Sequence, residues 1–153
     1  MNARIVITGV AGFIGSNLAD VLLQRGYEVW GVDNLSYGVR EQVPSGVRFL
    51  EMDIRSRDLV EVIREGDVVF HLAAKNCISD CQADPAETAS INVYGTVNVL
   101  EAARQRKAQK VIYAESSALY EGSRVMPTPE SETRICRHAS RLPSSTAIAP
   151  RWL

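Results

Sequence analysis

Three glycines at three-residue spacing, placed between a strand-like segment and a helix-like segment, constrain this chain more than any other feature. The run Thr8-Gly-Val-Ala-Gly-Phe-Ile-Gly15 puts them at positions 9, 12 and 15. The apolar, β-branched segment 4–8 before the run predicts a strand buried on both faces. A helix is expected after it, because apolar residues recur at four-residue spacing until Gly26 ends the pattern. The residues expected on that apolar face are Ile14, Leu18 and Leu22.

Each of these glycines has a physical role if the turn binds phosphate groups. Gly9 permits the tight turn, Gly12 lets the backbone approach a pyrophosphate, and Gly15 lets the helix pack closely on the sheet. The start of the helix, at Phe13 and Ile14, offers unpaired N–H groups and the positive end of the helix dipole. We therefore predict a dinucleotide-binding turn. The alternative is that the glycines only form turns in an α/β protein that binds no nucleotide.

A carboxylate closes the next predicted strand, residues 27–33. Asp33 lies 18 residues beyond Gly15. An acid at this place accepts hydrogen bonds from both hydroxyls of an adenosine ribose and repels a 2′-phosphate. The position therefore favours NAD over NADP, with a turn-forming aspartate as the alternative reading.

The rest of the chain continues the alternation of strands and helices. Further strands are expected at 47–52, 67–72 and 110–114, with a short helix at 57–65 and a long one at 84–106. The residues expected on the apolar face of the long helix are Val93, Val97 and Leu100. This pattern predicts an α/β fold, a partial doubly wound parallel sheet with five strands in the order 3-2-1-4-5 and helices on both faces.

The sequence changes character after about residue 122. Four prolines interrupt it at positions 127, 129, 143 and 150, and four arginines follow the last acidic residue, Glu132. We expect residues 1–122 to form the nucleotide-binding domain and residues 123–153 to form an irregular basic tail that is disordered or out of frame.

The overall composition argues against several classes of partner. The formal net charge of −1 gives no reason to expect nucleic acid or an acidic membrane. No apolar run approaches the roughly 18 residues of a membrane span, and the N-terminus does not resemble a signal peptide. The three cysteines, at 77, 81 and 136, have no zinc-like spacing. We therefore expect reduced thiols, no metal and a cytoplasmic chain.

Six segments, taken in order, resemble the extended short-chain dehydrogenase/reductase family in its nucleotide-sugar epimerase and dehydratase branch. They are Thr8–Gly15, Val32-Asp-Asn-Leu35, Asp53-Ile-Arg55, His71-Leu-Ala-Ala74, Asn92–Ala103 and Ala114-Glu-Ser-Ser-Ala-Leu-Tyr120. The resemblance is strongest to UDP-glucose 4-epimerases and covers residues 1 to about 122. It implies a Rossmann-like fold, NAD as cofactor and a nucleotide-sugar substrate.

The resemblance also implies which residues contact the cofactor. Asp53 would lie near the exocyclic amine of adenine, and residues 72–74 would border the nicotinamide ribose and the pyrophosphate. Asn76 and Lys75 could reach the phosphates, with a solvated loop as the alternative, and Asn92 would support the cofactor loop. The full implied set is Gly9, Gly12, Phe13, Ile14, Gly15, Asp33, Asn34, Asp53, Ile54, Leu72, Ala73, Ala74, Asn76 and Asn92. We interpret His71 as a packed core histidine.

The catalytic side chain implied by the resemblance is Ser116, with Ser117 as the fallback and two structural serines as the alternative. In the family such a serine works with a tyrosine and with a lysine four residues after that tyrosine. This sequence has no tyrosine after Tyr120 and no lysine after Lys110. We therefore expect that the chain as given does not complete the reaction.

Several alternatives stay open at this point. A 4,6-dehydratase or a sugar-nucleotide reductase of the same branch is one, although Ser117 and Ala118 stand where dehydratases usually carry an Asp-Glu pair. A non-catalytic NAD-binding fragment is another. We also hypothesise a frameshift or truncation after Glu132, which the coding DNA would test. The resemblance also implies a homodimer through helix 84–106, since the family pairs through this helix and its apolar face would lie partly exposed.

Overall fold

A computed structural model provides the structure of the chain. The residues that it describes are 4–116, 120, 123 and 125–129. The chain divides into two compact units, of which the first comprises residues 1–74 and 94–114 and the second residues 75–93 and 115–153. The whole sheet belongs to the first unit.

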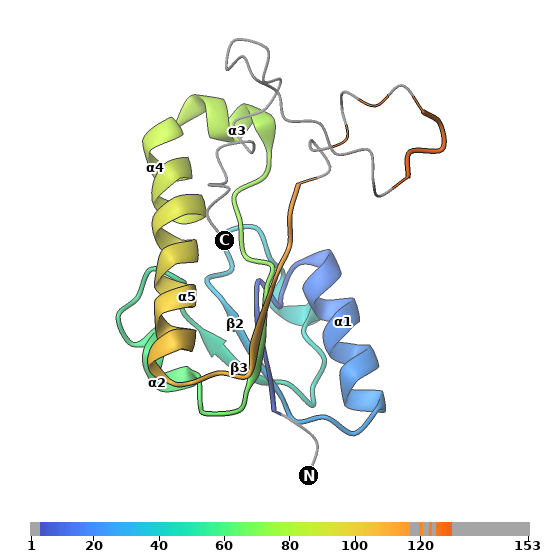
Figure 1. Cartoon of the computed structure of the whole chain (residues 1–153), viewed down its shortest axis with the longest axis vertical. Coiled ribbons are helices and arrows are strands. Elements are labelled where there is room, and N and C mark those ends of the chain that lie inside the picture. The colour runs from blue at the N-terminus through green and yellow to red at the C-terminus, as the bar shows by residue number, and fades with distance from the viewer. Residues whose placement is uncertain (1–3, 117–119, 121–122, 124, 130–153) are drawn as a thin grey trace. The chain divides into compact units, whose positions relative to one another are not determined.

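The first unit is built on a parallel sheet of five strands in the order β3-β2-β1-β4-β5 (Figure 1). The strands are β1 (Ile5–Thr8), β2 (Val29–Asp33), β3 (Arg48–Glu51), β4 (Val68–His71) and β5 (Lys110–Tyr113). The predicted fold class and strand order are therefore confirmed. Each strand is one or two residues shorter than predicted, although flanking residues still join the ladder, as when Leu72 N donates to Thr8 O at 3.1 Å.

Helices cover both faces of this sheet. Helix α1 (Phe13–Gln24) lies on one face, and α2 (Leu59–Val62) and α5 (Thr96–Gln105) lie on the other (Figure 1). A short 3-10 turn, Arg40–Gln42, follows β2. The second unit contains α3 (Ile78–Ala83) and α4 (Pro85–Ala89), and a π-helical turn, Ser90–Gly95, follows α4 in the chain.

The predicted helices needed correction in their lengths. The helix expected at 57–65 is only the single turn of α2, because Ile63 is already extended and Arg64 N donates to the carboxylate of Asp67. The helix expected at 84–106 consists of α4, the π-helical turn and α5. Helix α3 was not predicted.

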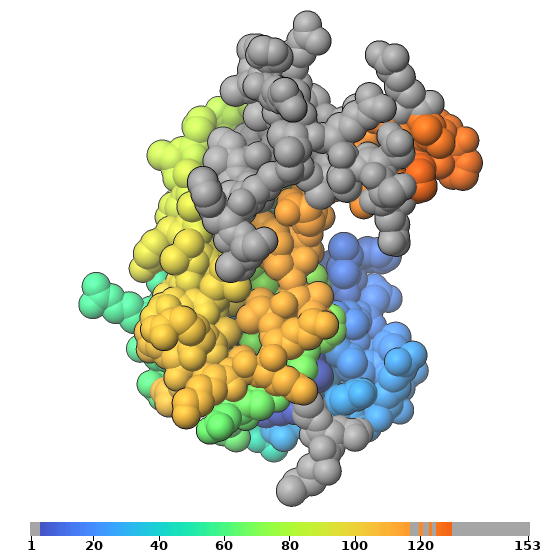
Figure 2. Space-filling model, in the orientation of Figure 1, coloured from blue at the N-terminus to red at the C-terminus, as the bar shows by residue number. Residues whose placement is uncertain are grey.

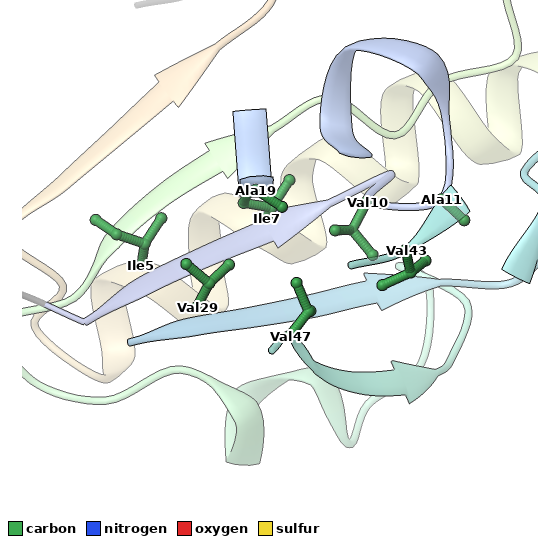
Figure 3. Packing of buried hydrophobic residues seen from close by; sticks show 8 residues of the cluster. All are labelled: Ile5, Ile7, Val10, Ala11, Ala19, Val29, Val43 and Val47. Atoms are coloured by element: carbon green, nitrogen blue, oxygen red, sulfur yellow. The ribbon is translucent and has the colours of Figure 1, made fainter. Parts of the chain in front are cut away.

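The core beside α1 is made of small and β-branched side chains. Figure 3 shows Ala19 of α1 beside Ile7 of β1, with Ile5 and Val29 on the same side of the sheet. The residues of α1 that are buried are Gly15, Ser16 and Ala19. Leu18 and Leu22 pack partly against this core, but Ile14 is 66% exposed, so its predicted place on the packed face was wrong. Small residues let the helix approach the sheet closely, and hydrophobic periodicity overlooks them.

Helix α5 shows the same effect on the opposite face of the sheet. Its buried residues are Val99, Ala102 and Ala103. Val97 is 52% exposed, so the predicted apolar face through Val97 was also wrong. Figure 2 shows α5 and β5, in yellow and orange, at the surface of the first unit.

In the part of the chain that the structure describes, no helix has both the length and the hydropathy needed to cross a bilayer.

Candidate functional site

Gly9 and Gly15 are required by the packing of the chain itself. Gly9 has a φ of +76°, which only glycine adopts without strain, and a Cβ there would lie 2.7 Å from Ala73 N. A Cβ on Gly15 would collide with the main chain of Gly9 and lie 2.8 Å from Val10 Cα. These two glycines let the turn pack against the end of β4 and let α1 start directly over the turn.

Gly12 differs from both, because internal packing does not require it. Its φ is −80°, and a Cβ there would meet only Gly9 O, at an ordinary contact distance of 3.4 Å. A side chain at position 12 would therefore extend into open space above the turn. The absence of a side chain leaves this surface of the backbone accessible to a ligand.

The start of α1 presents unpaired amides on the same turn. Ser16 N makes the first helical hydrogen bond, to Gly12 O at 2.9 Å. Among the described residues, no acceptor faces the N–H groups of residues 13–15, no side chain caps the helix, and its first turn holds no acid. Phe13 is 80% exposed. This end of the helix can accept an anion.

Asp33 connects the end of β2 to the turn. One carboxylate oxygen accepts from Ala11 N and the other from Leu35 N, both at 2.9 Å. Ala11 O in turn accepts from Val39 N at 3.1 Å, so both backbone groups of Ala11 are held. Each carboxylate oxygen keeps a second lone pair, and Asp33 is buried to 9% exposure at the edge of the turn. Asp33 therefore both fixes the turn and remains able to accept further hydrogen bonds.

Asp53 lies after β3 and is already engaged by several donors. Arg55 binds it through Nε at 2.9 Å and through a terminal nitrogen at 2.7 Å, and the backbone N–H of Arg55 adds a bond at 2.8 Å. Asn34 Nδ2 donates to the same carboxylate at 3.1 Å. The hydrogen bond from the Arg55 side chain is the main reason that the pKa of Asp53 falls to about 2. A further donor, such as an adenine amine, would share lone pairs with these groups.

Ile54 is placed differently from the other predicted contacts. Its side chain is 5% exposed, and a Cβ on Gly95 would lie 2.5 Å from its Cδ1. Its carbonyl oxygen accepts from Asn98 Nδ2 at 2.7 Å. Any contact that Ile54 makes with a ligand would therefore come from its main-chain N–H.

The end of β4 packs against the glycine-rich turn. Leu72 and Ala73 are half-buried, and Ala73 N donates to Thr8 Oγ1 at 3.4 Å. His71, just before them, is 2% exposed, as expected of a packed core histidine. Burial lowers the pKa of His71 to about 4, so the ring is neutral at physiological pH. Ala74 is exposed.

In the second unit, Asn92 holds the backbone of Lys75. Asn92 Oδ1 accepts from Lys75 N and Asn92 Nδ2 donates to Lys75 O, both at 2.9 Å. The Cys81 thiol also reaches Lys75 O, at 3.4 Å. Lys75 is buried, whereas Asn76 and Cys77 are exposed. The solvated loop, which was the alternative for this segment, does not describe Lys75, and the amide of Asn92 fixes its main chain.

The candidate catalytic serine follows β5 in the chain. Ser116 is half-buried, and its N–H donates to the Glu115 carboxylate at 3.1 Å. Ser117, the fallback, lies outside the described residues, as does most of the predicted tail at 123–153. Over the described ranges, no group of His, Cys, Asp and Glu has the arrangement of a metal site.

Sequence reasoning missed several residues that support the site. Thr8 and Thr96 bond to the two ring nitrogens of His71, and Asn98 Nδ2 donates to the carbonyl oxygens of Ile54 and Ser56. Their partners are 25 to 63 residues away in the sequence, so no local spacing marks them. Only the polar side chains inside apolar segments could have signalled them.

The comparison of the chain with protein-family models decides its membership. The model described as the NAD dependent epimerase/dehydratase family matches residues 5–141. The chain belongs to this family. The match includes the glycine-rich turn, the ends of β2 and β4, and the segment after β5.

Two curated members of the family show the range of similar proteins. The chain is 39% identical over 135 residues to a UDP-glucose 4-epimerase of Mycolicibacterium smegmatis, covering 83% of this chain and 43% of that protein. It is 36% identical over 152 residues to a UDP-N-acetyl-alpha-D-glucosaminuronate decarboxylase of Bacillus cytotoxicus, covering 97% of this chain and 47% of that protein. The chain spans less than half the length of these relatives.

The fold is also similar to that of a solved member of the epimerase/dehydratase family. The crystal structure of Thermus thermophilus UDP-glucose 4-epimerase in complex with NAD superposes with a TM-score of 0.79 at 35% identity. The match covers 95% of this chain and 47% of the other.

Proposed function

We propose that this chain binds NAD and forms the cofactor half of a nucleotide-sugar epimerase of the UDP-glucose 4-epimerase type. The observation that carries the proposal is Gly12. Packing requires glycine at positions 9 and 15, whereas a Cβ at Gly12 would meet only Gly9 O, at 3.4 Å. The main chain of Gly12 takes part in the turn, but nothing in the described packing requires that it lack a side chain. A bare backbone at this point is what a bound pyrophosphate requires.

The residues around the turn fit the parts of NAD. The free amides of residues 13–15 would bind the pyrophosphate, and Asp33 would bind the adenosine ribose through its remaining lone pairs. The negative charge of Asp33 would repel the 2′-phosphate of NADP. Asn34, Asp53 and the main chain of Ile54 are proposed to lie toward the adenine.

The other cofactor contacts are proposed from the family resemblance. Residues 72–74 would border the nicotinamide ribose, and Asn76 would reach a phosphate. Asn92 would act indirectly, because its amide fixes the main chain at Lys75.

When bound, NAD would accept a hydride from a sugar carbon and return it. Ser116 is the proposed side chain at the sugar hydroxyl, where it would orient the hydroxyl and hold its proton. A serine alone is a poor acid or base at neutral pH, since it needs a neighbour to activate it. After Ser116, these 153 residues contain one tyrosine, Tyr120, and no lysine. We therefore propose that they bind NAD without completing the reaction.

A second candidate function is a dinucleotide-binding module that performs no chemistry. The absence of a further tyrosine and lysine after Ser116 in these 153 residues favours this second function. A third is another nucleotide-sugar reaction of the same branch, since the similar proteins include a UDP-sugar decarboxylase. Ser117 and Ala118 argue against a dehydratase.

We further propose that the chain self-associates through helix α5 and the turn before it. Tyr94 and Val97 are 51% and 52% exposed there. Large apolar side chains on an open helix face promote association. We also propose that the chain is cytoplasmic and that its nucleotide-binding domain ends near residue 122. The segment after that boundary is proposed to be altered by a frameshift.

Calorimetry with NAD and NADP tests the main proposal. Gly12→Val fills the open surface of the turn, and Asp33→Asn removes the charge at the ribose position. The matched control is Asp20→Asn, which removes an exposed charge on α1 that accepts a hydrogen bond from Gln24. We expect NAD to bind more tightly than NADP, and each site variant to lose about tenfold or more in affinity, about 1.4 kcal/mol.

The melting temperatures of the variants show whether they remain folded. A chain that unfolds cooperatively but binds no NAD would overturn the proposal. If Gly12→Val binds NAD as tightly as the unsubstituted chain, the argument from Gly12 fails.

A further inference from the structure

Three side chains form a hydrogen-bonded path through the first unit, from β1 through β4 to α5. Thr8 Oγ1 lies 2.7 Å from His71 Nδ1, and His71 Nε2 lies 3.0 Å from Thr96 Oγ1. Thr8 is fully buried and His71 nearly so. Because Thr8 and His71 are shielded from water, their polar groups must find partners within the protein. Thr96, at the other end of the path, is half-buried.

The hydrogens of this path are assigned from the partners that each heavy atom has among the described residues. Ala73 N lies 3.4 Å from Thr8 Oγ1, and a backbone N–H can only donate. In the described part of the chain, the Thr8 hydroxyl hydrogen then has His71 Nδ1 as its acceptor. The neutral ring therefore carries its hydrogen on Nε2, which donates to Thr96 Oγ1.

The surroundings of His71 keep the ring neutral. The groups that face it are the hydroxyl of Thr8 from β1, the hydroxyl of Thr96 from α5 and the ring of Tyr113 from β5, whose centroid is 5.7 Å away. All three are uncharged at neutral pH. A protonated ring would donate from both nitrogens, and Thr8 Oγ1 would then face two donors with no acceptor for its own hydrogen.

At the Thr8 end of this path, the main chain of Leu72 and Ala73 lies against the glycine-rich turn. The position of a Cβ on Gly9 would be 2.7 Å from Ala73 N and 2.8 Å from Leu72 C. The main chain at residues 72 and 73 therefore packs directly on the turn. A shift of this segment by a few tenths of an ångström would either crowd Gly9 or open a gap beside it.

We propose that His71 is a positioning residue for the cofactor site, orienting the Thr8 hydroxyl so that Thr8 Oγ1 receives the Ala73 N–H and holds residues 72 and 73 against Gly9. The expected effect of His71 on NAD binding rests on the proposed function. Its structural part, the placement of Ala73 by His71 through Thr8, does not depend on NAD. His71 acts through Thr8 and makes no contact with the cofactor itself.

Two amide variants of His71 separate the two ends of the path. His71→Asn places an acceptor near the position of Nδ1 and is too short to reach Thr96. His71→Gln reaches toward Thr96 and leaves the Thr8 hydroxyl without an acceptor at the Nδ1 position. Thr8→Val removes the hydroxyl at nearly constant shape, and Thr8→Ser restores it. Thr96→Val removes the hydrogen-bond partner of His71 Nε2 on α5.

The measurements are amide hydrogen exchange at Ala73 by NMR and NAD affinity by calorimetry, both on the full chain. The amide of Val68, which donates to Arg4 O at 3.0 Å at the other end of β4, is the internal control. We expect Thr8→Val and His71→Gln to accelerate exchange at Ala73 about tenfold relative to Val68 and to weaken NAD binding by a similar factor. His71→Asn, Thr8→Ser and Thr96→Val should keep both values within about threefold of the unsubstituted chain.

The proposal is overturned if Ala73 and Val68 accelerate together in every variant, because His71 would then only stabilise the sheet. It is also overturned if Thr8→Val exchanges at Ala73 like the unsubstituted chain. If the unsubstituted chain binds no NAD, the proposed function fails, and the exchange data alone still decide whether His71 positions Ala73.

Discussion

Strands β1 and β5 belong to the same parallel sheet, and each leads into a segment with a proposed role, but the chain supports them very differently. All four residues of β1 are buried, and it pairs with β2 on one side and β4 on the other. β5 pairs with β4 alone among the described strands, and its first and last residues are exposed.

The difference continues beyond the strand ends. The turn after β1 is held by the end of β4, by Asp33 and by the loop at Val39. Ser116, after β5, donates its N–H to the residue next to it. The comparison teaches that three separate segments fix the cofactor turn, whereas β5, which leads to the candidate catalytic serine, pairs with a single described strand.

The largest effect that would test this comparison comes from Gly9→Val. The new side chain would meet the main chain of Ala73, and φ at this position is +76°. We expect the free energy of unfolding to fall by about 4 kcal/mol or more, or folding to fail. Urea denaturation measures the change. Gly12→Ala in the same turn is the matched control and should stay within about 1 kcal/mol; equal losses in both variants would show that packing demands all three glycines.

Acid should lower the stability of the chain through His71, which lies at the end of β4 between β1 and β5. The pKa of His71 is about 4 in the folded chain, against an ordinary value of 6.5, so the unfolded chain binds more protons between these values. The stability that comes from the neutral ring is therefore complete above pH 6.5 and is lost as the pH falls toward 4.

At about 1.4 kcal/mol for each pH unit, this loss approaches about 3 kcal/mol. Denaturation in urea from pH 7 to pH 4 measures it, with His71→Asn as the control that should remove this slope. If the unfolding free energy of His71→Asn still falls between pH 7 and pH 4, other titratable groups cause the effect. Asp53, whose pKa is lowered to about 2, responds only below pH 3.8, the ordinary value for an aspartate.

Shortening one valine in each strand compares the two strands directly. Val6 of β1 is 0% exposed, whereas Val111 of β5 is half-buried. We expect Val6→Ala to cost about 2 kcal/mol and Val111→Ala less than about 1 kcal/mol, because a half-buried side chain leaves a smaller cavity. Midpoints of urea denaturation give both values. Similar losses of unfolding free energy in the two variants would mean that Val111 is packed more tightly than its exposure indicates.

The smallest expected effect belongs to Ser116→Ala. We expect no change in NAD affinity and a change in unfolding free energy within about 0.5 kcal/mol, since this side chain is proposed to act on a sugar and not on the cofactor. Calorimetry and denaturation together check both values. Loss of NAD binding in this variant would show that the segment after β5 is part of the cofactor site.

The sequence was a good guide where one local pattern decides the structure. Runs of β-branched residues predicted the strands, and the alternation of elements predicted their order. Asp33 was found because the end of a parallel strand places it beside the turn. For the strands, the decisive residues lie within a few positions of one another. Asp33 is 22 residues from Ala11, to which it bonds, and was placed by the rule that the ends of neighbouring parallel strands meet at one edge of the sheet.

Prediction failed where packing depends on small residues or on distant partners. Ala102 and Ala103 face the sheet on α5, yet hydrophobic periodicity pointed to Val97. The bonds of His71 to Thr8 and Thr96 join three separate elements, and only the folded chain brings them together. The π-helical turn at Ser90–Gly95 had no signal in the amino-acid pattern.

The contrast between Gly12 and its two neighbours has an evolutionary consequence. Mutations at Gly9 or Gly15 are removed because the protein does not fold, whatever it binds. Mutations at Gly12 cost the fold less and are removed mainly while a ligand is bound there. In a lineage that had abandoned the cofactor, position 12 would drift first, and so its identity in related chains records whether the site is still in use.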